Sequence, residues 1–161
     1  MKNFVISIIC ALTLVSVAHA KGRGNDFAIG FHLLNGSALN QMGIGVKVEC
    51  DVADQLRLSP SFNYFFEKNS TSAWDIGVNL NYVVDVTSNF DVYPLVGVGF
   101  IRFTDDLGGG VSTDHDRVFA NLGLGADIAV TKEIWLTTEL RYQYIDDYGQ
   151  FVPSVGVKFC F

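Results

Sequence analysis

Large apolar residues alternate with small or polar residues along most of the chain after Phe27. The alternation recurs in eight segments, which span residues 27–33, 44–52, 56–66, 74–85, 90–100, 121–130, 134–144 and 151–161. Successive side chains of a β-strand point to opposite sides, so a period of two residues predicts a strand in each segment. No helical period competes with these runs, and the sequence therefore indicates an all-β fold.

The connections between these segments alternate between short and long. The short ones are 53–55, 87–89 and 131–133, and the longer, polar ones are 35–41, 68–72, 104–116 and 146–150. We expect each short connection to join two residues of the apolar side, namely Val52 with Leu56, Val86 with Phe90, and Val130 with Ile134. A slip of one residue would invert a strand, so this agreement favours an antiparallel, up-and-down arrangement.

A soluble barrel also alternates, but with its apolar side chains inside, so the period alone leaves the two faces unassigned. The polar positions carry mostly Gly, Ser, Asn and opposite charges, which fit a narrow lumen. Aromatic residues gather near both ends of the segments, as at the two interfaces of a membrane, and the segments are long enough to cross its hydrocarbon. Unpaired backbone groups are not tolerated in lipid, so the sheet has to close. The sequence thus predicts an eight-stranded antiparallel up-and-down transmembrane β-barrel.

The composition agrees with this interpretation. Hydrophobic residues make up 49% of the 161 residues and charged residues only 17%, which excludes a disordered chain. Beyond the N-terminus, no stretch approaches the ~20 apolar residues that a membrane-spanning helix needs. If the protein crosses a membrane, as its high apolar content suggests, it must therefore do so with strands. The 17 acidic residues outnumber the 11 basic ones, and this balance disfavours a nucleic acid as partner.

The N-terminus predicts a cleavable secretory signal peptide over residues 1–20, followed by a barrel domain over 21–161. Lys2 precedes an apolar stretch, and Ala18 and Ala20 place small residues where a signal peptidase reads them. The alternative is a short anchor helix, which the length of the apolar stretch disfavours. Two cysteines remain in the barrel domain, and the alternation turns Cys50 outward and Cys160 inward, so we expect no disulfide between them.

The end of the chain carries a further pattern. Ser154, Gly156, Phe159 and Phe161 form a polar-x-Gly-x-x-aromatic-x-aromatic sequence that resembles the C-terminal signal read by the barrel-assembly machinery. Together with the segments 97–99, 121–127 and 139–142, it makes the chain similar to the small porin-family outer-membrane barrels of the OmpA and OmpX type. The resemblance implies a place in the bacterial outer membrane with both barrel termini in the periplasm. It is specific for architecture and says little about activity.

Eight charged residues fall on the polar side of the predicted strands, and we expect them to line the lumen: Lys47, Glu49, Asp51, Arg57, Asp127, Glu139, Arg141 and Lys158. They could form a gated path for ions or a packed network of pairs. The packed network is favoured because an unpaired buried charge is costly. Asp51 and Arg57 face each other across the first short connection and exemplify such a pair.

Three functions remain open at this point. The favoured one is a structural or surface-interaction protein with a plugged lumen, acidic outer loops, surrounding lipid and an unidentified extracellular partner. The alternatives are a narrow channel for ions or small apolar molecules, and a lipid A-modifying enzyme. For the enzyme, His115 has Ser112 and Asp114 nearby in sequence, but proximity in a loop does not make a nucleophile. The acidic residues of 104–116 match no calcium-loop pattern, so we predict neither a metal nor a cofactor.

Overall fold

The computed structural model describes residues 27–38, 40–68, 70–106, 112–146 and 148–161. Its strands are β1 (Phe27–Gly36), β2 (Gln41–Ala53), β3 (Leu56–Lys68), β4 (Thr71–Tyr82), β5 (Val84–Thr87), β6 (Phe90–Asp106), β7 (Ser112–Ala129), β8 (Ile134–Ile145) and β9 (Tyr148–Cys160). None of the helices in the described part of the chain is long and apolar enough to cross a membrane.

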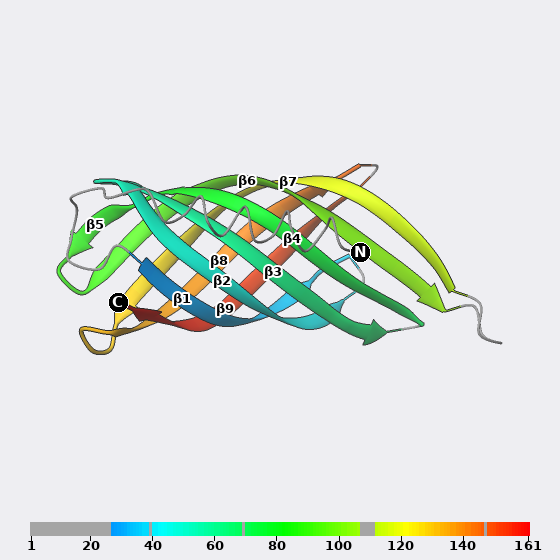
Figure 1. Cartoon of the computed structure of the whole chain (residues 1–161), viewed down its shortest axis with the longest axis horizontal. Helices are drawn as coiled ribbons and strands as arrows, with labels where there is room; N and C mark the ends of the chain where they lie inside the picture. Colours follow the sequence, from blue (N-terminus) through cyan, green and yellow to red (C-terminus); the bar gives the residue numbers. More distant parts are fainter. Residues whose placement is uncertain (1–26, 39, 69, 107–111, 147) are drawn as a thin grey trace, which may run out of the picture.

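The strands close into a barrel, seen from the side in Figure 1. Each strand pairs antiparallel with its neighbour in sequence, except that β6 pairs with both β4 and β5, and β9 pairs back with β1. The break between β4 and β5 falls at Val83, whose amide donates to the carbonyl of Gln55 at 2.7 Å. β4 and β5 both pair with β6, and β5 continues the line of β4, so the two together count as one strand of the barrel. The nine labelled strands therefore form eight barrel strands, and the predicted eight-stranded up-and-down barrel is confirmed.

The apolar side chains face outward, as the sequence predicts for a membrane barrel. Val98 and Leu124 each expose 67% of their surface, whereas Asn79 exposes 4% and Asp127 none. A soluble barrel would show the reverse distribution, since water would face its outer wall. The register pairs Phe27 with Cys50 on the outside and Ala28 with Cys160 on the inside; both cysteines are free thiols.

Two of the three expected pairs at the short connections are wrong by one residue. Ala53, not Val52, lies opposite Leu56, and Thr87, not Val86, lies opposite Phe90. Each strand carries an irregularity just before the turn, and such bulges are common at barrel rims because one extra residue lets the strand bend. At the third connection, the Val130 amide donates to the Ile134 carbonyl at 2.9 Å.

The long connections are shorter than the sequence suggests. Residues 104–116 were expected to form a loop, yet β6 and β7 stay paired as far as Asp106 and Ser112. The alternation fades there because both faces of this hairpin are polar, not because the pairing stops. Cross-strand contacts replace the apolar pattern: Thr104 donates to Asp114 at 2.9 Å, and Arg102 contacts Asp116.

Candidate functional site

Ion pairs gather in the lumen near the short connections. Glu49 lies at the centre of this group, with its carboxylate oxygens 3.0 Å from Lys47 Nζ, 3.2 Å from Arg57 Nη1 and 2.9 Å from Lys158 Nζ. Glu49 and Lys158 each expose only 2% of their surface. Three cations around one carboxylate require further acidic partners, because burying unbalanced charge is strongly unfavourable.

Those further partners come from the opposite strands. Asp127 accepts from Arg57 at 3.0 Å and also from Lys158, and Glu139 accepts from Lys47 at 2.6 Å. The Lys47–Glu139 pair joins β2 to β8, so it crosses the lumen. We call the following seven residues the ion layer: Lys47, Glu49, Asp51, Arg57, Asp127, Glu139 and Lys158.

Asp51 lies at one edge of the ion layer, and the uncharged Tyr93 contacts the layer from outside it. Asp51 accepts from Arg57 Nε at 2.9 Å, and its side chain keeps 21% of its surface exposed. The Tyr93 hydroxyl donates to Glu139 at 2.9 Å, and the residue is fully buried. Its ring lies directly over Gly125 of the neighbouring strand, where a Cβ atom would collide with it. The alternation placed Tyr93 on the inner side, but nothing in the sequence predicted its contact with the charges.

Arg141 is the one residue of the predicted lumen charges that the structure places outside the contacts of the ion layer. It exposes 2% of its surface, and its Nε and Nη2 atoms have no hydrogen-bond acceptor among the described residues. Glu139, two residues earlier on the same strand, points to the same side of β8 and is the nearest acidic member of the ion layer in sequence.

A chain of polar side chains follows toward the long connections. His32 Nε2 lies 2.7 Å from Asn63 Oδ1, and Asn63 donates to Asp75 at 2.6 Å. Gln150 donates to Gln143 at 2.6 Å. All five residues are buried, and each occupies an inward position.

An apolar cluster lies inside the barrel above this chain. We call it the apolar plug; its residues are Leu34, Phe65, Ala73, Ile101, Phe119, Ile145 and Val152. Phe65 exposes 2% of its surface, and Ile101 and Ile145 expose none. The Phe119 ring fits over Gly77, where an added Cβ would come within 3.0 Å of it. The sequence did not reveal the plug, because apolar residues at inward positions look like a break in the alternation.

The residues considered for catalysis do not assemble. The strand register puts Asp114 on one face of β7 and His115 on the other, and the side chain of Ser112 lies outside the described part of the structure. His115 Nε2 instead lies 3.9 Å from Asp105 Oδ2, across the hairpin. Asp114 accepts a hydrogen bond from Thr104.

The strand that closes the barrel, β9, carries Ser154, Gly156 and Phe159, and Phe161 directly follows it. Gly156 pairs with His32 on one side and Thr137 on the other, and Phe159 exposes 39% of its surface on the outer wall. The Phe161 amide donates to the Phe27 carbonyl at 2.9 Å, so the two ends of the described chain meet. Ala18 and Ala20 lie outside the described residues.

The comparison with protein families decides the assignment. The family described as "Outer membrane protein beta-barrel domain" matches residues 8–161 of the chain. The chain belongs to this family. Membership places the protein in the bacterial outer membrane. The eight-stranded barrel with an apolar outer surface, described above, agrees with this location.

Solved structures of outer-membrane proteins share the fold of this family member. Neisserial surface protein A is 19% identical, with a TM-score of 0.73 over 84% of this chain and 97% of that one. The N-terminal β-barrel domain of Pseudomonas aeruginosa OprF is 18% identical, with a TM-score of 0.68 over 86% and 100%. Ail, the attachment invasion locus protein of Yersinia pestis, is 17% identical, with a TM-score of 0.60 over 84% and 96%. No curated protein sequence matches the chain.

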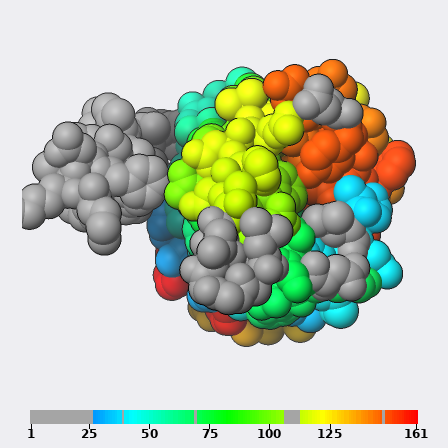
Figure 2. Space-filling view, turned by 90° about the vertical axis from the view of Figure 1, so that its right-hand side faces the viewer, coloured from blue at the N-terminus to red at the C-terminus, as the bar shows by residue number. Residues whose placement is uncertain are grey.

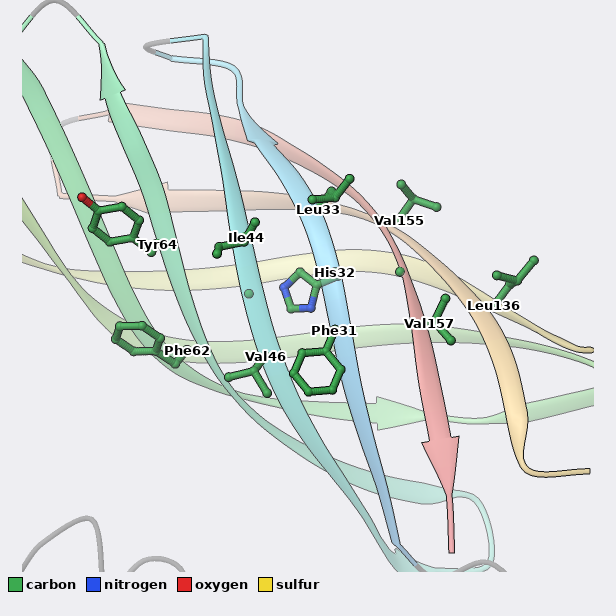
Figure 3. Close-up of a pocket in the computed structure, with 12 residues that line it drawn as sticks. Phe31, His32, Leu33, Ile44, Val46, Phe62, Tyr64, Leu136, Val155 and Val157 are labelled. Carbon is green, nitrogen blue, oxygen red and sulfur yellow. The ribbon is translucent and has the colours of Figure 1, made fainter.

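The outer wall of this family barrel carries an apolar groove of about 660 Å³, shown in Figure 3. Side chains from β1, β2, β3, β8 and β9 line it, including Phe31, Ile44, Phe62 and Val155. The strands are close together beside His32, because a Cβ on Gly156 would come within 2.7 Å of the His32 Cβ. The groove is part of the wall that faces hydrocarbon, as its lining requires.

Proposed function

We propose that this protein is a closed, non-conducting barrel that presents its β6–β7 hairpin at the bacterial surface as a structural and interaction element. The proposal rests on one observation: two different groups of side chains occupy the lumen at different heights. Ion pairs fill it toward the short connections, and an apolar plug fills it toward the long ones. A barrel of eight strands is just wide enough for side chains to fill.

The two layers oppose conduction for different physical reasons. In the ion layer, a passing ion would have to displace charges that already hold each other at 2.6 to 3.2 Å. In the apolar plug, it would lose its hydration without gaining a polar partner. Either layer alone would close the lumen, so the narrow-channel alternative has no support in these contacts.

The outer hairpin supports a surface role. Beyond the plug, Asp114 and Asp116 on β7 and Asp146 after β8 are exposed. Arg117 Nη1 donates to the Asp146 carbonyl at 3.2 Å, which ties the hairpin to the β8–β9 connection. Figure 2 faces this end of the barrel and shows the yellow part of β7 beside the orange residues of the β8–β9 hairpin. An acidic surface of this kind favours a basic partner.

One structural relative offers a contrast. Ail of Yersinia pestis has been crystallised in complex with the heparin analogue sucrose octasulfate, a highly charged anion. The exposed aspartates of this chain would repel such a ligand. The extracellular partner we propose is therefore of a different kind.

The remaining parts of the proposal concern biogenesis and orientation. Lipid acyl chains cover the outer wall and its groove, and the barrel-assembly machinery reads Ser154, Gly156, Phe159 and Phe161 after a signal peptide has directed export. Both barrel termini lie in the periplasm. The support is that Phe27 and Phe161 meet at the end with the short connections, with ring centroids 6.2 Å apart, as Figure 1 illustrates for the end of β9.

Two measurements test the proposal. Liposomes that contain the folded protein should release entrapped potassium no faster than empty liposomes, whereas a trimeric porin serves as the leaking control. Rapid release would overturn the closed lumen. Release of acyl chains from lipid A by the same protein would replace the surface role with the enzymatic one.

Orientation is tested in intact cells. An epitope inserted between Asp106 and Ser112 should bind antibody on intact cells, and an epitope inserted after Lys132 should bind only after the membrane is opened. The opposite pattern would contradict the proposed topology.

A further inference from the structure

A hollow of about 410 Å³ lies at the outer mouth of the barrel, above the apolar plug. Ala38 of the β1–β2 connection lines one part of it. The other lining residues come from β4, β6, β7 and β9: Thr71, Phe103, Asp105, His115, Arg117 and Tyr148. Phe103 lies opposite His115 and Ile101 lies opposite Arg117, which places these side chains on the inward face of the hairpin.

The floor of the hollow is aromatic. Phe103 and Tyr148 are partly buried and pack against the apolar plug, with their ring centroids 6.2 Å apart. The Tyr148 hydroxyl, like an ordinary phenol, carries its proton at neutral pH and can donate a hydrogen bond. The floor therefore combines apolar ring surface with one neutral donor.

The walls carry polar groups that are held in place. Thr71 Oγ1 donates to Asp105 Oδ1 at 2.5 Å, while Asp105 Oδ2 faces His115 at 3.9 Å. On the other side, Arg117 is held by its hydrogen bond to the Asp146 carbonyl. The hollow thus presents one carboxylate acceptor, one guanidinium donor and one imidazole around its aromatic floor.

We propose that this hollow binds the ring of a neutral sugar. A sugar ring has an apolar C–H face, which suits Phe103 and Tyr148, and a rim of hydroxyls that both donate and accept. Asp105 accepts from such hydroxyls, and Arg117 donates to them. This site lies outside the closed part of the lumen and does not depend on whether the barrel conducts.

The same groups exclude other classes of ligand. The hollow holds one carboxylate, Asp105, and one guanidinium, Arg117, whose charges largely cancel, so it favours neither a polyanion nor a simple cation. A pure hydrocarbon would leave the carboxylate and the guanidinium without partners, at a considerable desolvation cost. The volume lies within the range of small-molecule sites, and a mixed lining of ring surface and few oriented polar groups is typical of them.

The test uses the full barrel, folded in phosphatidylcholine nanodiscs, and saturation-transfer difference NMR. The probes are the methyl glycosides of glucose, galactose, mannose and N-acetylglucosamine, with choline and sucrose octasulfate as charged comparison probes. We expect transfer to the ring C–H protons of at least one glycoside and none to the charged probes. Absence of transfer to all four glycosides, or stronger transfer to a charged probe, would overturn the proposal.

Variants locate the site. Phe103→Leu and Asp105→Asn should each weaken glycoside binding about tenfold, because one removes the aromatic face and the other the charged acceptor. Phe66→Leu, an aromatic change on the outer wall at the same end of the barrel, should leave binding unchanged. Equal binding by wild type and both mouth variants would contradict the site. If Phe103→Leu does not fold, as judged by its unchanged gel mobility on boiling, Tyr148→Phe replaces it.

A final experiment distinguishes a sugar of the membrane from a soluble sugar. Lipopolysaccharide in the same leaflet and a soluble glycan would present the same ring chemistry. Adding lipopolysaccharide to the nanodiscs should abolish the glycoside signal if the membrane supplies the ligand. An undiminished signal assigns the site to a soluble glycan, and both results support binding of a sugar ring.

Discussion

The two layers inside the barrel fill the same narrow space by opposite chemistry. The ion layer relies on charges of which all but Asp51 contact two or more partners, and Glu49 is surrounded by three cations. The apolar plug relies on close packing of side chains such as Phe65 and Ile145. The layers should therefore respond differently to substitution: the ion layer to a change in charge at constant volume, and the plug to a change in volume at constant polarity.

The largest effect is expected for Glu49→Ala. This change leaves Lys158 and Arg57 sharing Asp127 and removes one of the two acidic partners of Lys47, in a buried setting. We expect the free energy of unfolding to fall by about 4 kcal/mol. Guanidinium unfolding in lipid vesicles measures it. Glu49→Gln, which keeps the volume, should lose nearly as much; a small loss would mean that volume, not charge, matters here.

The plug should respond to volume. Phe65→Ala removes a ring that is 98% buried and should lower the free energy of unfolding by about 3 kcal/mol through the cavity it leaves. The matched control is Phe66→Ala on the next residue, whose side chain faces outward and is 46% exposed. If both changes cost the same, the loss does not come from the plug.

Tyr93 packs closely against the backbone of Gly125, and we expect a substitution there to lower stability by a smaller amount. Gly125→Ala places a Cβ against the Tyr93 ring and should cost about 2 kcal/mol. Gly30→Ala is the control, because the nearest atom to its added Cβ is the flexible Lys47 Cγ at 3.2 Å. Melting temperatures of the two folded barrels, followed by circular dichroism, should therefore differ, with Gly30→Ala close to the wild type.

The smallest effect lies outside the lumen, in the exposed hairpin. The hydrogen bonds from Arg102 lower the pKa of Asp116, so the pair is intact above the ordinary carboxyl pKa and is lost as the pH falls through the lowered value. In Arg102→Gln the pKa of Asp116 should return toward the ordinary value, while global stability stays unchanged. Carbon-detected NMR titration of the carboxyl follows the shift, and an unaltered titration would show that Arg102 is not its cause.

The contrast between the layers also explains what the sequence could predict. Seven of the eight expected lumen charges meet in the ion layer, because a charge at an inward position is conspicuous in the alternation. The plug escaped notice because Ile101 and Ile145 are as apolar as residues of the outer wall. That Arg141 Nε and Nη2 have no hydrogen-bond acceptor among the described residues depends on side-chain conformation, so the sequence could not predict it either. Residues 104–116 were assigned to a loop, because both faces of the hairpin are polar there and no alternation of apolar and polar residues remains.

The central claim is that each layer closes the lumen by itself. Single-channel recording in planar bilayers of the wild type and of Phe65→Ala, both verified as folded by heat-modifiable gel mobility, tests it most directly. The account predicts no conductance steps from either protein, because the ion layer stays intact when the plug is opened. Steady steps from the wild type, or steps that emerge in Phe65→Ala alone, would contradict it.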